Sequence, residues 1–153
     1  MTPLDSFDIA ILRLLQHDNM MTQRDIGQSV NLSAPSVQRR IRRMQADGVI
    51  AANVARIDPD AVGLTLTIFV EVELVSETPK DIDAAKSRFR DAPEVQQCHY
   101  VTGDTDFMLI VVVESMVAYE AFTRRMFFQD GNVRKFRTFV SMDTVKTGVA
   151  LNI

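Results

Sequence analysis

Four arginines lie within five residues of this chain, between Arg39 and Arg43. A guanidinium stays charged at physiological pH and donates hydrogen bonds in a fork that matches a phosphate or the major-groove edge of guanine. No acidic side chain occurs from Leu32 until Asp47. The cluster favours contact with nucleic acid, although a run of charge is also compatible with a solvated helix face.

Other side chains offer little chemistry. Cys98 is next to His99, but His17 is too isolated from them in sequence to predict a metal site. We find no glycine-rich phosphate loop and no hydroxyl nucleophile with an obvious base, so we expect no catalytic residue, no metal and no cofactor. In a strand, Cys98 and His99 are expected to face opposite sides, one the core and the other solvent.

The arginines belong to a segment expected to form a helix from about Ala34 to about Asp47. Ser33 is a suitable N-cap ahead of Pro35, and Gly48 lies where a helix would end. At the helical repeat, one stripe holds Val37, Ile41 and Met44. The opposite stripe holds Pro35, Arg39, Arg42 and Arg43. A helix of this size and charge fits a major groove.

Two further helices are expected before it. The first starts near Leu4 and ends near Asp18, with Asp5 and Asp8 at the end where the helix dipole favours negative charge. The second covers residues 23–30 after a cap at Thr22, and its Gly27 suggests close helix packing. Only a few residues separate the second and third helices, as in a helix-turn-helix.

The segment after Gly48, residues 49–58, is apolar and tolerant of β-structure, so we expect a small wing. It carries Arg56, for which two interpretations remain open. The side chain contacts a phosphate, or it forms a surface ion pair with Asp58 or Asp60.

Composition places the chain among soluble globular proteins. Its 153 residues are 46% hydrophobic, and the single cysteine excludes an internal disulfide framework. No apolar run is long enough to span a bilayer and no signal segment is recognisable, so we expect a cytoplasmic protein without a membrane partner. The formal net charge of −3 does not exclude nucleic acid, because residues 1–60 hold seven arginines and seven aspartates and four of those arginines cluster.

The hydrophobic pattern changes after a short hinge with turn residues between Asp58 and Gly63. From Val62 to Leu74 apolar residues alternate with others, which is typical of a half-buried strand. A helix is then expected from Thr78 to Asp91, followed by strands over 95–102 and 107–113 that are joined by a turn with the sequence GDTD. Ser115 caps a second helix, residues 130–132 form a turn, and a last strand covers 133–142.

This order, βαββαβ, is that of the split βαβ or ferredoxin-like motif. The expected fold class is therefore α+β, with an N-terminal winged helix-turn-helix and a ferredoxin-like sheet domain. We expect residues 1–50 to form the DNA-binding domain, 51–62 the wing and hinge, and 63–153 the sheet domain. Unpaired sheet edges and faces in so small a unit favour association into a dimer and a higher oligomer.

Taken together, three stretches resemble the Lrp/AsnC family of feast/famine transcriptional regulators: LDSFDIAILRLLQ, LSAPSVQRRIRRMQADGVI and VQQCHYVTGDTDFMLIV. The resemblance covers essentially the whole chain. It implies a regulator that binds double-stranded DNA, senses a small molecule, in most relatives an amino acid, and assembles from homodimers into a tetramer or octamer.

By the resemblance, the helix from Ala34 is the recognition helix. The matched positions that would meet DNA are Ser36, Gln38, Arg39, Arg42 and Arg43. The helical geometry independently places the last three on the charged face. Gln38 lies at its flank, while Arg40 lies nearer the packed side and is expected to hold a phosphate or a neighbouring helix.

The resemblance also implies an effector site around the hairpin turn, at Thr102, Gly103, Asp104, Thr105 and Asp106. A turn offers backbone N–H groups to a carboxylate, and an aspartate can accept from an α-ammonium. The alternative is that GDTD is only a favourable hairpin turn. Thr105 and Asn53 replace an aromatic residue and a tyrosine found in many relatives.

Two other functions fit the same architecture. Siroheme decarboxylases resemble this family across both domains, which would make the chain an enzyme, and a ligand-independent architectural DNA-binding protein would differ from a regulator only in the breadth of its DNA binding. The arginine-rich third helix favours the regulator, and tetrapyrrole binding would favour the enzyme.

Overall fold

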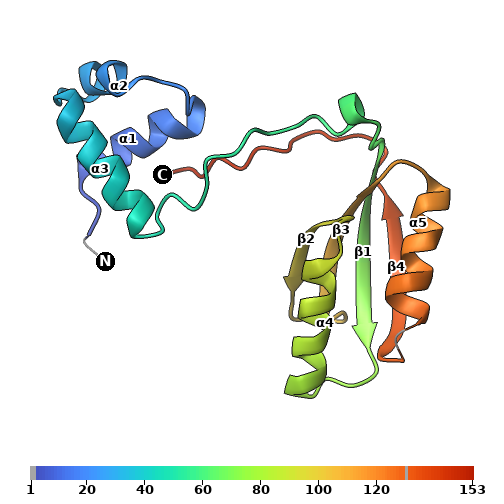
Figure 1. The fold of residues 1–153 in the computed structure, drawn as a ribbon. Helices are drawn as coiled ribbons and strands as arrows, with labels where there is room; N and C mark the ends of the chain where they lie inside the picture. The colour runs from blue at the N-terminus through green and yellow to red at the C-terminus, as the bar shows by residue number, and fades with distance from the viewer. Residues whose placement is uncertain (1–2, 130) are drawn as a thin grey trace. The chain divides into compact units, whose positions relative to one another are not determined.

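The computed structural model describes residues 3–129 and 131–153, which divide into two compact units (Figure 1). The first, here called the helical unit, contains the residues up to Arg56 together with Lys146–Ile153; the second, the sheet unit, covers Ile57–Val145. Among the helices of the described residues, none is long and apolar enough to cross a membrane.

Three helices make the core of the helical unit, and they begin where the sequence predicts. Helix α1 covers Ser6–His17, α2 covers Gln23–Val30 and α3 covers Ala34–Ala46. Asp5, Thr22 and Ser33 accept a backbone N–H three residues ahead, which satisfies a donor that the first turn of a helix leaves free. The buried apolar side chains of the unit come from all three helices: Ile11, Ile26, Val30, Val37 and Met44.

The turn between α2 and α3 is tight. Asn31 ends α2 in the left-handed conformation at φ 56°, and the Leu32 N–H donates back to the Gly27 carbonyl at 2.9 Å. A Cβ on Gly27 would lie 2.5 Å from the Leu32 carbonyl oxygen. The close approach expected at Gly27 is therefore to the backbone of the turn and of the first residue of α3, Ala34.

The segment expected to form a wing, residues 49–58, contains no strand. Residues 51–58 are exposed and irregular, so the strand expected in this segment is not formed. A strand needs the hydrogen-bonding groups of a neighbour, and within the described residues of the helical unit there is no other strand to supply them. After Pro59, the short 3₁₀ helix Asp60–Val62 and Gly63 at φ 80° form the turn expected at the hinge.

The last residues of the chain pack with the helical unit, although the sequence placed them at the end of the sheet domain. The Gln16 side chain donates to the Leu151 carbonyl at 3.2 Å and accepts the Leu151 N–H at 2.6 Å. Arg13 Nε donates to the Ile153 carbonyl at 2.5 Å. These bonds attach the tail to the outer side of α1.

The sheet unit has four antiparallel strands in the order β2-β3-β1-β4, which confirms the ferredoxin-like arrangement. The strands are β1 (Leu66–Leu74), β2 (Val95–Tyr100), β3 (Phe107–Val113) and β4 (Val133–Val140). Strand β1 begins later than the alternation from Val62 suggested, because the 3₁₀ turn and Gly63 occupy the preceding residues.

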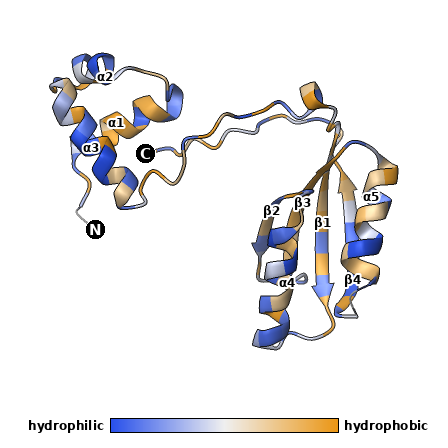
Figure 2. Ribbon diagram, viewed as in Figure 1, coloured by the Kyte–Doolittle hydropathy of each residue, from blue (hydrophilic) through white to orange (hydrophobic). Residues whose placement is uncertain are grey.

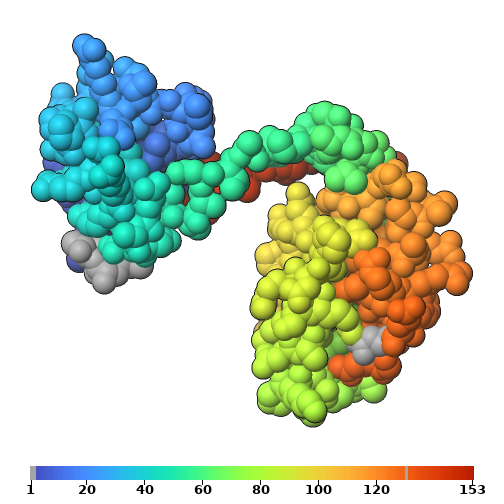
Figure 3. Space-filling model, viewed as in Figure 1, coloured from blue at the N-terminus to red at the C-terminus, as the bar shows by residue number. Residues whose placement is uncertain are grey.

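Two helices cover one face of this sheet (Figures 1 and 3). They are α4 (Pro79–Asp91) and α5 (Met116–Thr123), and α5 continues into a π-helical turn over Arg124–Phe128. Phe89 of α4 packs 6.3 Å from Phe127, centroid to centroid, and 5.2 Å from Phe107 of β3. The core of the unit therefore lies between these helices and one face of the sheet. The turn predicted at 130–132 includes Asp130, which lies outside the described residues.

Among the described residues of the sheet unit, none covers the opposite face of the sheet, which we call the open sheet face. Register places Phe69 of β1 between Ile110 of β3 and Phe139 of β4, so these three side chains form a row across the sheet. Phe69 is 39% exposed and Phe139 49% exposed. In the next row, Glu71 pairs with Arg137 at 2.6 Å.

Candidate nucleic-acid interface and sheet-domain turn

Helix α3 packs through the stripe that the sequence predicts. Val37 and Met44 are buried, and Ile41 packs partly against the same core. Gly48, at φ 74°, allows the chain to turn after the helix, and the Val49 and Ile50 N–H groups both donate to the Met44 carbonyl. Figure 2 shows the strongly hydrophilic stretch of α3.

Two of the four clustered arginines bind α1. Arg40 Nη1 lies 2.8 Å from Asp8 Oδ1 and 2.8 Å from Asp5 Oδ2, and Arg43 Nη2 pairs with the other oxygen of Asp8. The Asp8 side chain is 0% exposed. Arg40 also lies over the ring of Phe7, 5.5 Å from its centroid. Of the two partners expected for Arg40, a phosphate or a neighbouring helix, the structure places it on the helix.

The ionisation of Asp8 reflects this pairing. Burial alone would raise its pKa, but hydrogen bonds from Arg40, the Asp5 backbone N–H and Arg43 outweigh burial and hold the pKa below its ordinary value. Asp8 is therefore a carboxylate at neutral pH. Its charge offsets part of the positive charge on the inner side of α3.

The other two arginines remain available. Arg39 and Arg42 are exposed, and neither forms an ion pair with the described part of the chain. Their positions, three residues apart, put them on the same side of α3. Arg56 is also exposed, and its possible ion pair with Asp58 or Asp60 is not formed within the described residues.

The remaining predicted positions of α3 lie beside this charged side. Ser36 accepts a hydrogen bond from the hydroxyl of the N-cap Ser33 at 2.9 Å, so it helps to close the first turn. Gln38 is half-buried and forms no hydrogen bond to the described residues. Asp8, the partner of two of the arginines, was not predicted from the sequence, where its place at the start of α1 is the only signal.

The turn between β2 and β3 is anchored to the end of β1. Thr105 Oγ1 donates to the Val72 carbonyl at 2.9 Å, and the Asp106 N–H donates to the same carbonyl at 3.0 Å. Asp106 Oδ2 accepts the Leu74 N–H at 2.7 Å. Both side chains therefore take part in the turn itself. Thr102, Gly103 and Asp104 are exposed, with Gly103 at φ 129°.

Cys98 and His99 point to opposite sides of β2, as expected from strand geometry. Cys98 pairs in register with the buried Leu109 and faces the helices, whereas His99 pairs with Met108 on the open sheet face. Within the described residues there is no group of three or more His, Cys, Asp or Glu side chains that could hold a metal ion.

Comparison with known families adds two matches that together cover most of the chain. Residues 4–45 match the AsnC-type helix-turn-helix domain, and residues 67–151 match the Lrp/AsnC ligand binding domain. An uncharacterized HTH-type transcriptional regulator of Sinorhizobium fredii is 41% identical over 150 residues, which is 98% of this chain and 89% of the relative.

Two solved structures have the same fold along nearly the whole chain. One is an AsnC family transcriptional regulator from Agrobacterium tumefaciens, with a TM-score of 0.91, 33% identity and coverage of 97% of this chain and 96% of the relative. The other is a transcriptional regulator from Neisseria meningitidis in complex with L-Met, with a TM-score of 0.89, 26% identity and the same coverage.

Proposed function

This chain belongs to the Lrp/AsnC family of transcriptional regulators, and on that premise we propose that it binds specific DNA sequences under the control of an amino-acid effector. The observation that supports DNA binding is that the four clustered arginines fall into two pairs with different surroundings. Arg40 and Arg43 are paired with α1, while Arg39 and Arg42 are exposed on α3 without an ion pair among the described residues. A helix with two free guanidinium groups on its outer side can reach base edges and phosphates together.

The proposed contacts on DNA are made by Ser36, Gln38, Arg39, Arg42 and Arg43. Exposure and the absence of a competing carboxylate support base or phosphate contacts for Arg39 and Arg42. Asp8 occupies one nitrogen of Arg43, whose side chain is still 33% exposed, so the remaining N–H groups can donate to a phosphate. In this arrangement Asp8 fixes the direction of Arg43.

The proposed effector site is the turn formed by Thr102, Gly103, Asp104, Thr105 and Asp106. Its first three residues are exposed, and Asp104 offers a carboxylate to an α-ammonium. Asp106 Oδ2 accepts the Leu74 N–H, whereas Asp106 Oδ1 accepts no hydrogen bond from the described residues and can accept one from an effector. The L-Met complex of the regulator from Neisseria meningitidis supports an amino acid as the class of effector.

We propose that the protein is a homodimer that assembles further into a tetramer or octamer. The row of Ile110, Phe69 and Phe139 on the open sheet face supports this proposal, because two half-exposed aromatic rings beside an aliphatic side chain gain free energy when a partner covers them. The partner proposed is a second copy of the chain.

One experiment tests the regulator against its alternatives. Duplexes selected from a random pool by the full-length protein are compared with scrambled duplexes by fluorescence anisotropy, with and without each of the twenty amino acids. A regulator prefers the selected duplex by about 10³-fold or more, and one amino acid changes that affinity. Equal affinity for both duplexes would indicate an architectural protein instead.

The enzyme alternative has its own signature. A siroheme-decarboxylase-like protein would bind a tetrapyrrole and absorb in the visible region, whereas we propose that this chain is a non-enzymatic regulator working beside DNA in the cytoplasm. Titration with a tetrapyrrole, followed by absorption spectroscopy, distinguishes the two functions without any assay of catalysis.

A further inference from the structure

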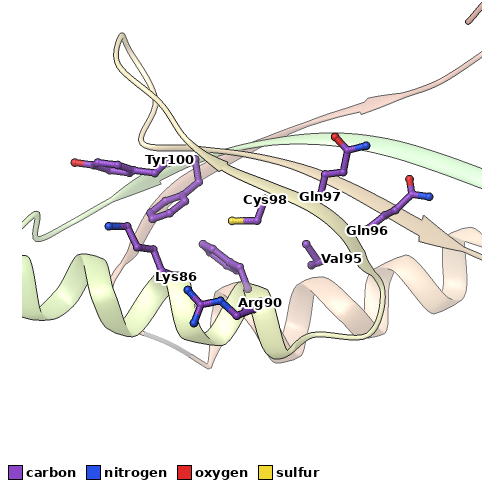
Figure 4. Close-up of a pocket in the computed structure, with 9 residues that line it drawn as sticks. Lys86, Arg90, Val95, Gln96, Gln97, Cys98 and Tyr100 are labelled. Carbon is purple, nitrogen blue, oxygen red and sulfur yellow. The ribbon is translucent and has the colours of Figure 1, made fainter. Parts of the chain in front are cut away.

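A pocket of about 390 Å³ lies between α4 and β2, on the helix-covered side of the sheet unit (Figure 4). Its volume falls in the range of small-molecule sites. None of the turn residues from Thr102 to Asp106 lines it, so it is separate from the proposed effector site.

The floor of the pocket is aromatic. Phe89 and Phe107 are fully buried and meet edge to face, with 5.2 Å between their centroids. The ring of Tyr100 lies 5.2 Å from that of Phe107, and Val95 completes the apolar lining. This surface favours an apolar ligand body over a phosphate or another wholly polar anion.

The rim of the pocket is cationic. Lys86 and Arg90 lie one turn apart on α4, and Lys86 Nζ is 4.9 Å from the centroid of the Tyr100 ring. Lys86 has one carboxylate nearby, the largely exposed Asp83 at 3.6 Å, and Arg90 forms no ion pair within the described chain. Among the described residues, none that lines the pocket is acidic.

The wall of the pocket carries the thiol of Cys98, which points from β2 into the space above α4 (Figure 4). Burial raises the pKa of this thiol, and the positive charge of Arg90 only partly opposes that effect. The group is therefore neutral at pH 7 and adds a soft, polarizable surface. It is also the only cysteine of the chain, which makes it a specific reporter of the pocket.

We propose that this pocket binds a small apolar carboxylate, with its anionic group on Lys86 and Arg90 and its hydrocarbon body against Val95 and the ring of Tyr100, the apolar side chains of the lining that are accessible. A free amino acid fits less well. Its α-ammonium would approach two cations in a pocket that offers no carboxylate, and like charges at short range repel. The site would thus recognise a different chemical class from the turn, and the proposal does not rest on the proposed effector site.

Protection of Cys98 tests the proposal in the full-length protein. The rate of modification by N-ethylmaleimide, an uncharged reagent, is followed by mass spectrometry with 3-phenylpropanoate or 4-methylpentanoate present, and compared with phenylalanine or leucine. Each amino acid has the same hydrocarbon body as its partner and adds an α-ammonium. We expect the two carboxylates at about 10 mM to slow modification at least fivefold, and the amino acids to slow it less than twofold.

Variants that remove a positive charge from the rim of the pocket provide a second test of the proposal. Calorimetric affinity for 3-phenylpropanoate should fall about tenfold in Arg90→Gln and in Lys86→Gln, because each loses a charge-assisted contact. Lys80→Gln is the matched control, since Lys80 is exposed on the first turn of the same helix and does not line the pocket. Circular dichroism verifies that each variant is folded.

Three results would overturn the proposal. They are the absence of Cys98 protection by either carboxylate, equal protection by the matching amino acids, and an equal loss of affinity in Lys80→Gln and Arg90→Gln.

Discussion

Arg40 on α3 and Asp8 on α1 are 32 positions apart in the chain and meet at 2.8 Å, between Nη1 and Oδ1. Because Asp8 also binds Arg43, one buried carboxylate holds two side chains that are nearly one turn apart on α3. These two ion pairs therefore fix the orientation of α3 about its own axis relative to α1. That orientation determines which arginines face outward.

Removal of the carboxylate should destabilise the helical unit. In Asp8→Asn the Arg43 guanidinium loses its carboxylate partner and Arg40 keeps only Asp5, so we expect the free energy of unfolding to fall by about 1–3 kcal/mol. Urea denaturation measures the change. Asp143→Asn makes the same chemical change at an exposed site and should alter stability little; equal losses in both variants would mean that the buried pairing contributes nothing.

The contribution of Asp8 should depend on pH. Its folded-state pKa is lowered from 3.8, so its stabilising effect is fully present above pH 3.8 and is lost as the pH falls through the folded value. The difference in unfolding free energy between wild type and Asp8→Asn should therefore be constant above pH 3.8 and should shrink as the pH falls below this value. A difference that stays constant as the pH falls below this value would contradict the assigned pairing.

The exposed and the paired arginines should behave differently on DNA. We expect Arg39→Ala or Arg42→Ala to cost about 1–3 kcal/mol of affinity for the selected duplex if the side chain reads a base. Arg43→Ala should weaken selected and scrambled duplexes alike, as loss of a phosphate contact does. Anisotropy at a fixed salt concentration measures both effects, with the exposed Arg124 of the π-helical turn after α5 changed to Ala as control. Unchanged affinity in the three α3 variants would contradict the groove assignment.

Substitution of Asp106 distinguishes a role in effector binding from a purely structural role in the turn. If it accepts from the effector's ammonium, Asp106→Asn should weaken the amino acid by about ten- to a hundredfold with little loss of stability. If its bond to the Leu74 N–H is its whole role, the melting temperature should fall while the response to ligand remains. Calorimetry with the most stabilising amino acid, combined with thermal unfolding, separates these outcomes.

The row of apolar residues on the open sheet face predicts the assembly. Phe69→Glu or Phe139→Glu would place a charge in the dimer contact, and we expect the dimer dissociation constant to rise by about a hundredfold or more. Light scattering over a concentration series measures it. Val117→Glu on α5 is the control, because Val117 is 77% exposed and lies on the helix side of the sheet. A monomeric wild type would contradict the assembly outright.

Local signals in the sequence predicted most of the helices and strands. Caps at Thr22, Ser33 and Ser115 placed three helix starts correctly, since a hydroxyl that satisfies a free N–H acts within three residues. Strict alternation likewise identified the buried face of β1, at Ile68, Val70, Val72 and Leu74.

Interactions between residues that are distant in the chain could not be predicted from such local signals. The helical repeat put Arg43 on the charged side of α3, but it carries no information about Asp8, which lies 35 positions earlier. The wing was predicted from residue types alone, whereas a strand depends on a partner elsewhere in the chain. The turn bonds of Thr105 and Asp106 with β1 are equally distant in sequence and equally absent from the local pattern.

The attachment of Leu151 and Ile153 to Gln16 and Arg13 has a practical consequence for labelling. A fluorophore attached at Ile153 would lie beside α1, so its signal would report on the helical unit. A label intended for the sheet unit is better introduced at an exposed site within that unit, such as Val117.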